Sequence, residues 1–439
     1  MKLYCITVPK LPSDVRTLAS VSLAIRNNET TKAKSSKSAK PEKEYIAYQF
    51  VGYPTDEQKQ TLLQNIGAAR WMWNHLKYDH DTAYKETGTS VWKTPADYKK
   101  LNEYSWLKDV DSLALCNVQL NLQKAYRSFF DGKAGYPKFK KKALCKAAYT
   151  TNSVNNSIRL DNGRLVLPKV NGTIRLRVHR DIPNGMTVKS CNVCHKPDGK
   201  WMFTILCEST SEPSAKIPNV YQLLLKGDRE GIRHIGLDMS LPEMYVDSDG
   251  CVPSYVVNDV LVGFRKCYRG LEDRIAREQR KLSHMQKGSG NYQKQCIRIA
   301  KLHAKAKHQR NDFLHQIAVR LARSYDVISI EDLDMNAMKQ SLRLGKSVSD
   351  NGWGMFVRIL EEKCEQYGCT LVKVSRWFPS SKTCSHCGHI HKELKLNERT
   401  YICPKCGHVM DRDYQAAVNI DREGLRVILD FYDSRQWAS

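Results

Sequence analysis

In the stretch CSHCGHIHKELKLNERTYICPKCGHVMDRD, which spans residues 384–413, two Cys-x-x-Cys pairs lie 15 residues apart. The pairs are Cys384 with Cys387 and Cys403 with Cys406. Four thiolates at this spacing are typical of a tetrahedral zinc site that leaves no coordination position open. We therefore predict one structural Zn²⁺ bound by these four cysteines, without a catalytic role.

Acidic residues follow the second pair and also end two apolar strands earlier in the chain. Asp238 and Glu331 each end such a strand, and Asp413 precedes a helix. Carboxylates at the ends of adjacent strands meet at one edge of a sheet, where they can hold two divalent cations ~3.5–4 Å apart. We predict that Asp238, Glu331 and Asp413 are catalytic and bind two Mg²⁺ or Mn²⁺ ions, which prefer oxygen ligands. Asp411 is the alternative to Asp413, although it is also placed to cap the helix.

A further Cys-x-x-Cys pair, Cys191 with Cys194, lies in a predicted hairpin with no second pair nearby. We interpret these two residues as ordinary buried cysteines, because an isolated pair supplies only half of a zinc site.

The chain is strongly basic. Its 439 residues include 70 Lys and Arg against 46 Asp and Glu, which gives a formal net charge of +24. Such a surface attracts polyphosphates, so nucleic acid is the expected partner.

No stretch approaches the ~20 apolar residues of a membrane span, and no apolar run indicates a signal peptide. The 15 cysteines then favour a reducing compartment. We predict a cytoplasmic protein.

Two basic segments are candidates for nucleic-acid contact. The run GYPKFKKK at 135–142 combines aromatic rings, which can stack on bases, with lysines that neutralise phosphate. A long helical pair at 265–323, broken near Gly288, is also strongly basic. The predicted contact residues are Tyr53, Lys138, Lys140, Lys141, Lys142, Arg274, Arg277, Arg298, Lys301 and Lys305.

Changes in residue pattern divide the chain into segments. Short alternating runs and turn dipeptides at 148–208 predict a small antiparallel barrel or sandwich, to which 45–53 adds a strand. From residue 232 the pattern becomes α/β, so the expected fold class is α+β multidomain. The predicted boundaries are an N-terminal extension and flexible linker at 1–44, a first barrel strand at 45–54, a helical insertion at 55–135, the β-barrel at 136–225, an α/β domain at 226–379, a zinc element at 380–410 and the C-terminal part of the α/β domain at 411–439.

Taken together, these residues resemble the TnpB family of transposon-encoded, RNA-guided endonucleases, which is related to compact type V CRISPR effectors. The likeness covers roughly residues 45–425. It is carried most specifically by the run Ser380 to Cys384, the second cysteine pair and the run Asp411 to Ala417. Gly236-Leu237-Asp238 and Ile330-Glu331-Asp332-Leu333 also match.

The resemblance implies a wedge β-barrel with a helical recognition insertion, then an RNase H/RuvC-like nuclease domain with an inserted zinc ribbon that loads the target strand. It implies two-metal-ion cleavage of DNA at a single RuvC site. Target specificity would come from guide-RNA pairing and a short flanking motif. The implied partners are guide RNA and double-stranded and single-stranded DNA. The resemblance assigns Asp238, Glu331 and Asp413 as the RuvC triad, and so settles the choice over Asp411.

The alternative function is an RNA-guided DNA-binding regulator without cleavage. Such a protein would be expected to lose an acid of the triad, and all three acids are present. Three features depart from the family pattern: Ser240 replaces a common glycine, Gln415 replaces a frequent asparagine, and residues 1–44 extend beyond the usual start. None of them removes a predicted metal ligand. The sequence does not separate a transposon-carried protein from a derived CRISPR-like effector.

Overall fold

The computed structural model describes residues 5–7, 45–209, 218–334 except 241, 258 and 265, and 352–436 except 396 and 397. Apart from residues 5–7, the N-terminal extension and flexible linker expected at 1–44 lie outside these residues. The chain divides into two compact units, which are considered one at a time. The N-terminal unit is residues 36–213, and the C-terminal unit is residues 214–439 together with 1–35.

The N-terminal unit is built on one antiparallel sheet. Its seven strands, counted over the described residues, follow the order β3-β7-β8-β2-β6-β5-β4. The sheet is open, with β3 and β4 at its edges, so the predicted antiparallel pairing is confirmed but a closed barrel is not formed. The strands are β2 (Tyr45–Tyr53), β3 (Ala147–Asn152), β4 (Arg159–Asp161), β5 (Arg164–Val166), β6 (Ile174–Arg177), β7 (Thr187–His195) and β8 (Trp201–Glu208).

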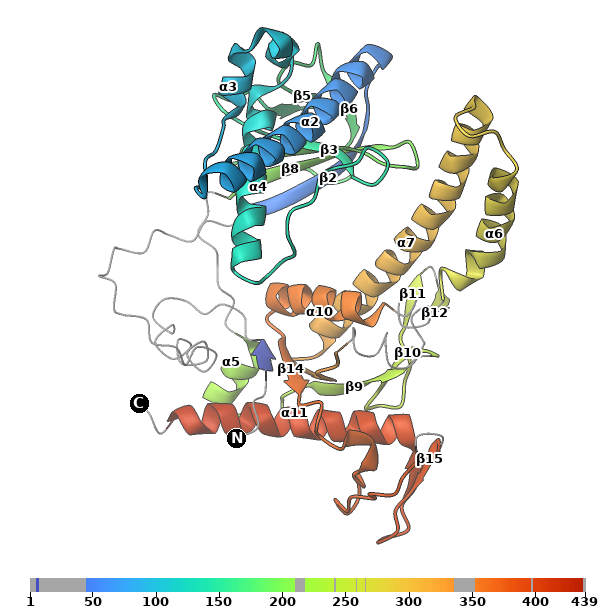
Figure 1. Ribbon diagram of the computed structural model, residues 1–439. Helices are drawn as coiled ribbons and strands as arrows, with labels where there is room; N and C mark the ends of the chain where they lie inside the picture. Colours follow the sequence, from blue (N-terminus) through green and yellow to red (C-terminus); the bar gives the residue numbers. More distant parts are fainter. Residues whose placement is uncertain are drawn as a thin grey trace. The chain divides into compact units, whose positions relative to one another are not determined.

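Helices are inserted between β2 and β3, as the sequence predicts (Figure 1). They are α2 (Asp56–Thr87), α3 (Pro95–Lys100), the 3-10 helix η1 (Asn102–Lys108) and α4 (Ser112–Phe130). A capping box begins α2: the Gln58 N–H donates to Thr55 Oγ1, and Gln58 Oε1 accepts from the Thr55 N–H. Sequence reasoning missed the short helix α3.

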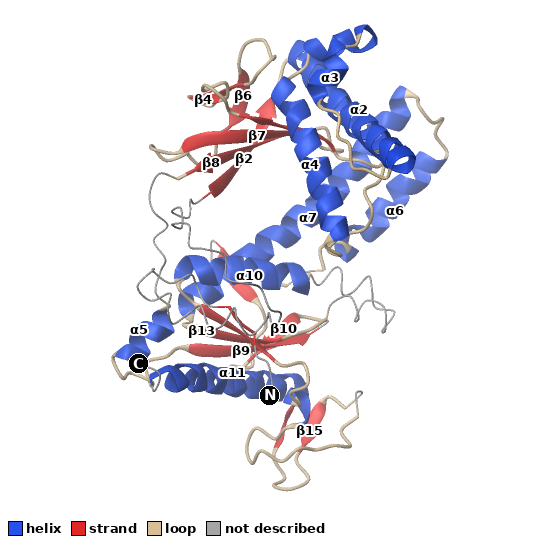
Figure 2. Cartoon of the chain, turned by 60° about the vertical axis from the view of Figure 1, so that its left-hand side comes forward, coloured by secondary structure: helices blue, strands red, loops and turns tan. Residues whose placement is uncertain are grey.

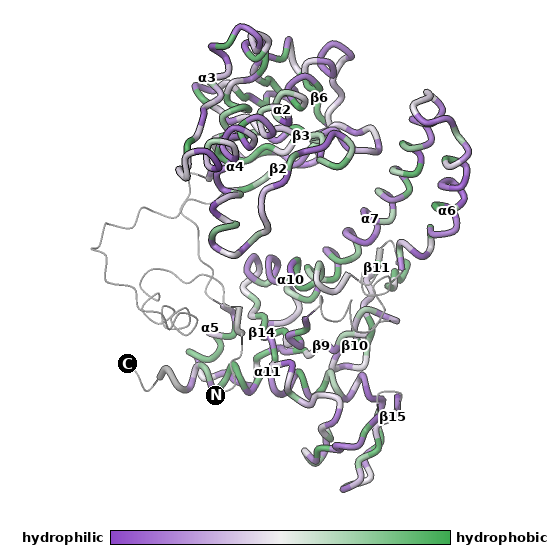
Figure 3. Tube along the Cα trace, viewed as in Figure 1, coloured by the Kyte–Doolittle hydropathy of each residue, from purple (hydrophilic) through white to green (hydrophobic). Residues whose placement is uncertain are grey.

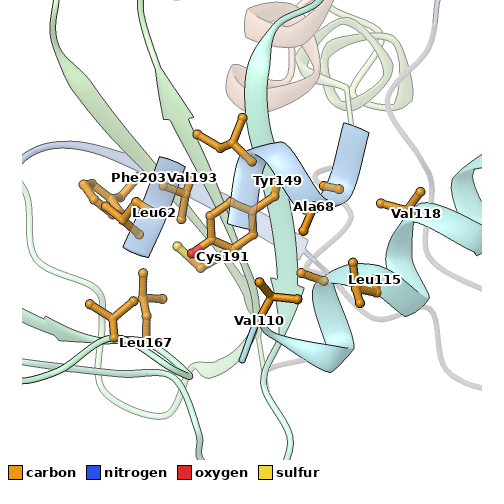
Figure 4. Packing of buried hydrophobic residues seen from close by; sticks show 14 of the residues in the cluster. Leu62, Ala68, Val110, Leu115, Val118, Tyr149, Leu167, Cys191, Val193 and Phe203 are labelled. Atoms are coloured by element: carbon orange, nitrogen blue, oxygen red, sulfur yellow. The ribbon is translucent and has the colours of Figure 1, made fainter. Parts of the chain in front are cut away.

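The core of this unit lies between the sheet and the two long helices. Figure 4 shows Tyr149, Cys191 and Phe203 of the strands packed with Leu62 of α2 and Leu115 of α4. Each of these side chains is buried. Cys191 and Cys194 therefore supply core residues, as predicted, since both are free thiols and both are buried.

The C-terminal unit contains a mixed sheet. Over the described residues its five strands follow the order β1-β14-β13-β9-β10. Strands β9, β13 and β14 are parallel, whereas β1 and β10 are antiparallel edges. Cys5–Thr7, which the sequence analysis placed in an N-terminal extension, is edge strand β1 of this sheet. The other strands are β9 (His234–Ser240), β10 (Met244–Asp247), β13 (Val327–Glu331) and β14 (Thr370–Val374).

Helices cover both faces of this sheet (Figure 2). On one face, Leu237 and Ile330 pack into a core with α7 (Gly290–Ser324) and α10 (Trp353–Tyr367). On the other face lies α11 (Arg412–Gln436), with Val427 against Val327. The remaining described elements of the unit are α5 (Asn219–Leu225), the hairpin β11 (Ser254–Val257) with β12 (Val260–Gly263), α6 (Arg269–Ser283), the 3-10 helix η2 (Ser380–Lys382), β15 (Thr400–Ile402) and β16 (Val409–Asp411). No helix in the described part of the chain is both long and apolar enough to cross a membrane.

The basic helical pair expected at 265–323 is α6 and α7. Figure 3 shows that α6 is mostly hydrophilic, and only Ile275 and Glu278 of α6 are buried. Buried Glu278 lies 3.1 Å from Lys281 Nζ and accepts a hydrogen bond of 2.8 Å from Gln295 of α7, which joins the two helices. The other side chains of α6 are therefore at least partly accessible to solvent or a ligand.

Helix α11 approaches the sheet closely at small residues. A methyl group on Gly236 of β9 would overlap the carbonyl oxygen of Ala417, and one on Gly424 would overlap the side chain of Ser329. At the start of β9, His234 Nδ1 lies 2.9 Å from Asp421 of α11. These contacts fix the helix on β9 and β13.

We predict that Gly236→Ala destabilises the C-terminal unit by about 1–3 kcal/mol, because the new methyl group must push α11 away from β9. Calorimetry on the full chain measures the lowered melting temperature. Gly67→Ala in α2 is the matched control: no atom lies within 4 Å of the added methyl group, so the change should be neutral or stabilise by up to about 1 kcal/mol. Equal effects of the two substitutions would contradict the close packing.

Candidate active site

The register of two parallel strands places the first two predicted acids side by side. Ile330 of β13 pairs with Leu237 of β9. The next residues along the strands are Glu331 and Asp238, so they lie level at the same edge of the sheet. Because side chains alternate along a strand, both project from the face opposite the buried Leu237 and Ile330. That face is the one covered by α11.

The third acid reaches this edge because α11 runs antiparallel to β9. Asp421 lies beside His234, and Ala417 lies beside Gly236. Two further residues of strand advance about 6.6 Å to Asp238. One helical turn back from Ala417, about 6 Å, leads to Asp413. The structure therefore brings Asp413 to the same edge.

The electrostatics of the three acids agree with this placement. Burial raises the pKa of Asp238 well above its usual range, and the charges of Glu331 and Asp413 raise it further. Burial raises the pKa of Glu331 to about 7. A nearby negative charge repels an ionised carboxylate and so raises its pKa. The raised pKa of Asp238 therefore agrees with the closeness of the other two acids. The site thus gathers three acidic groups in a partly buried place, where the charged form of Asp238 is disfavoured.

The chemistry of the three carboxylates fits divalent cations. Carboxylate oxygens at a partly buried edge are the ligands that Mg²⁺ and Mn²⁺ prefer. Among the described residues, the oxygens of Asp238, Glu331 and Asp413 do not all lie within 4.8 Å of one another.

Asp411 has a different position from Asp413. Its Oδ1 accepts hydrogen bonds of 3.0 Å from the backbone N–H groups of Asp413 and Tyr414. Asp411 therefore caps the start of α11, as expected for a carboxylate at a helix N-terminus. Asp413 instead lies 3.5 Å from Arg399 Nη1 in a partly exposed ion pair. Sequence reasoning missed Arg399, since nothing near it in the sequence indicates this contact.

The four cysteines of the zinc element converge. Their sulfur atoms all lie within 4.8 Å of one another, the one such cluster of potential metal ligands among the described residues. The Sγ atoms of Cys384 and Cys406 are 3.7 Å apart, and those of Cys387 and Cys403 are 3.6 Å apart. A tetrahedral site with Zn–S bonds of ~2.3 Å has edges of about 3.8 Å. The cluster could therefore bind Zn²⁺.

The two halves of the cluster share one backbone design. The N–H of Cys384 donates to His389 O, and the N–H of Cys403 donates to His408 O, each over 2.8 Å. Gly388 and Gly407 follow the second cysteine of each pair, with φ of 73° and 69°. This left-handed conformation favours glycine, so each pair forms a tight turn that aims two thiols at one point.

The zinc element is attached to α11. Asn419 Nδ2 donates to the carbonyl oxygens of Ser380 and Thr383, over 2.8 and 2.6 Å. Arg422 Nη1 donates to Ser385 O. Together with the Arg399–Asp413 contact, these bonds tie the cluster to the same helix that carries Asp413.

The predicted nucleic-acid contacts occupy exposed positions in both units, with one exception. Tyr53 is half exposed and lies under the Arg175 guanidinium. Lys140 is partly buried, with Nζ 3.7 Å from the centre of the Trp73 ring. The exposed lysines and arginines are Lys138, Lys141, Lys142, Arg274, Arg277, Arg298, Lys301 and Lys305; Arg298 also lies 3.6 Å from Glu278.

Helix α2 holds the basic loop at 136–140 in place, which sequence reasoning did not foresee. Trp73 Nε1 donates to Lys138 O, and the amide of Asn74 exchanges two hydrogen bonds with the Lys140 backbone. Tyr136 donates to Asp81 over 2.8 Å. The helical spacing of these α2 residues is the signal that could have indicated a second element packed on this face.

Three family models match successive parts of the chain. They are described as "Helix-turn-helix domain" over residues 45–89, "Probable transposase" over 228–342 and "Cas12f1-like, TNB domain" over 353–420. In the structure, residues 45–89 contain strand β2 and the single helix α2.

Curated relatives match most of the chain. A "Putative RNA-guided DNA endonuclease" of Streptomyces pristinaespiralis is 32% identical over 386 residues, covering 86% of this chain and 89% of the relative. The chain belongs to the TnpB family. A second relative, InsQ of Escherichia coli K12, is 28% identical, covering 87% of this TnpB-family chain and 93% of the relative. The structure titled as a Cas12f1–sgRNA–target DNA complex is similar with a TM-score of 0.49 and 14% identity, covering 83% of this chain and 82% of that one.

We predict that Cys384→Ser abolishes binding of the equivalent of one Zn²⁺ per chain, because a hydroxyl cannot replace the thiolate at this site. Metal analysis of the purified protein measures the loss. Cys116→Ser is the matched control, since Cys116 is an exposed free thiol in the other unit and its substitution should leave the zinc content unchanged. Unchanged zinc content in Cys384→Ser would reject the four-cysteine assignment.

Proposed function

We propose that this TnpB-family protein is an RNA-guided DNA endonuclease with one RuvC-type active site formed by Asp238, Glu331 and Asp413. The observation that carries the proposal is the meeting of these three acids at one edge of the sheet, where burial and mutual repulsion raise the pKa of Asp238. The Streptomyces relative, named as an RNA-guided DNA endonuclease, aligns with this chain over 89% of its own length and supports the same activity.

The three carboxylates would hold two Mg²⁺ or Mn²⁺ ions, which activate water and stabilise the leaving oxygen of a phosphodiester. Strands β9 and β13 fix Asp238 and Glu331 on a rigid support. Asp413 is positioned separately by α11, with Asp411 capping the helix and Arg399 beside the Asp413 carboxylate. A rigid arrangement of ligands lowers the cost of reaching the reactive geometry.

Guide RNA and target DNA are the proposed partners. The exposed cations of α6, α7 and the 138–142 loop would contact the phosphate backbone, so binding should weaken as salt rises. Base pairing to the guide would select the target, together with a short flanking motif read by the protein. A protein with one active site must cut the two strands in turn. We therefore assign strand loading to the zinc element, which is bonded to α11 beside Asp413. Such a protein would act in the prokaryotic cytoplasm, at the nucleoid.

The decisive experiment compares Asp238→Ala with the wild type, each assembled with the RNA that copurifies with it. We expect the rate of cleavage of a matched DNA target in Mg²⁺ to fall by at least a thousandfold. The affinity for the target should stay within about twofold of the wild type, because the contacts to the nucleic-acid phosphate backbone lie elsewhere. Gel assays of cleavage and binding on the same preparation measure both.

Asp273→Ala is the matched control, since Asp273 is an exposed acid on α6 and its loss should leave cleavage unchanged. Cleavage near the wild-type rate in Asp238→Ala would remove Asp238 from the mechanism. Target binding without any cleavage by the wild type, with and without EDTA, would favour the non-cutting regulator instead.

A further inference from the structure

A pocket of about 340 Å³ opens in the N-terminal unit between α2, α4 and strand β3. Its size lies within the ~300–1,000 Å³ typical of small-ligand sites. Part of its lining is apolar and comes from all three elements: Ile66 and Ala69 of α2, Val118 of α4 and Tyr149 of β3. Each of these side chains is less than 9% exposed.

Three cations line the same pocket, and no acidic residue does. They are Arg70, Lys140 and Lys146. Within the described residues, the side chains of Arg70 and Lys146 have no hydrogen bond or ion pair. Lys140 is stacked over Trp73, and its burial lowers its pKa. Cations that lack a carboxylate partner favour an anionic ligand.

Two amides in the pocket are held in fixed orientations by β3. Asn117 Nδ2 donates to Thr150 O over 3.0 Å. Asn192 Nδ2 donates to Tyr149 O over 3.2 Å and to Thr150 Oγ1 over 2.8 Å. Among the described residues, no donor hydrogen-bonds to the side-chain carbonyl oxygens of Asn117 and Asn192. Polar groups that are already ordered cost less entropy when they bind a ligand.

We propose that this pocket binds one unpaired nucleotide of a polynucleotide. The base lies against the apolar wall, with its edge on Asn117 and Asn192, and the phosphate lies at Arg70 and the two lysines. A base in a duplex is held in the stack and does not enter, so the pocket selects a single-stranded or extruded nucleotide. The identification of the ligand as nucleic acid rests on the proposed function, but binding at the pocket does not require cleavage.

The test uses the full-length protein, freed of nucleic acid, and short single strands of one sequence as RNA and as DNA. Both strands carry 4-thio-substituted pyrimidines for photocrosslinking. We expect adducts on peptides that contain residues 66–73 or 145–150, identified by mass spectrometry. The strand that gives the adducts, RNA or DNA, identifies the source of the nucleotide. An excess of free mononucleotide should compete only weakly.

Arg70→Ala and Asn117→Leu should each lower the adduct yield on these peptides at least fivefold. Arg127→Ala is the matched control: Arg127 is exposed on α4, outside the pocket, and its loss should change the yield less than twofold. Arg70→Ala removes no intramolecular bond among the described residues, so its effect does not depend on unfolding.

Wild-type yields in both pocket variants would overturn the proposal, as would equal adduct formation by a duplex of the same sequence. Absence of these adducts in a preparation that cleaves its target would reject the pocket and leave the endonuclease proposal standing. Adducts that depend on Arg70 in a protein that does not cleave would support the pocket and count against the endonuclease.

Discussion

The candidate active site depends on the close approach of helix α11 to strand β9. Gly236 has no side chain, so the Ala417 carbonyl can lie directly against the strand. Gly424 does the same for Ser329 of β13. These contacts set the antiparallel alignment of helix and strand, which in turn brings Asp413 to the edge where Asp238 and Glu331 end. An acid on a separate helix can reach the edge of a sheet only when the helix is held at a fixed position along the strands.

This arrangement gathers negative charge at a cost in stability. Burial and like charge raise the pKa of Asp238, because the ionised form loses solvation and gains no full compensation from protein cations. Arg399 Nη1 lies 3.5 Å from the Asp413 carboxylate in an ion pair that is considerably exposed to solvent. Apolar cores on both faces of the sheet stabilise the unit against this cost: Leu237 is fully buried on one face and Val327 on the other. Functional sites are often the places where a fold keeps ionisable groups whose pKa values are shifted at a cost in free energy of unfolding.

The zinc element and α11 form one connected piece. Asn419 and Arg422 of the helix hydrogen-bond to backbone carbonyls at 380–385, next to the first cysteine pair. A change in the cluster would therefore be transmitted to the helix that carries Asp413. In the N-terminal unit, α2 plays a comparable part by holding the basic loop through Trp73 and Asn74. In both units the charged groups are held in place by helices. This rigidity suits recognition of a nucleic-acid backbone of regular geometry.

Much of this protein was determined by sequence alone. The four cysteines, the start of α2 at its capping box, and the strands that end at Asp238 and Glu331 follow from local pattern, because capping, alternation and ligand spacing act over a few residues. Tertiary structure decided what depends on distant segments. It left the seven-stranded sheet open, added Cys5–Thr7 to the other sheet, separated the roles of Asp411 and Asp413, and formed a cationic pocket between α2, α4 and β3. No local pattern encodes these features, because each arises where side chains from segments far apart in the chain pack at a distance that only the folded backbone sets.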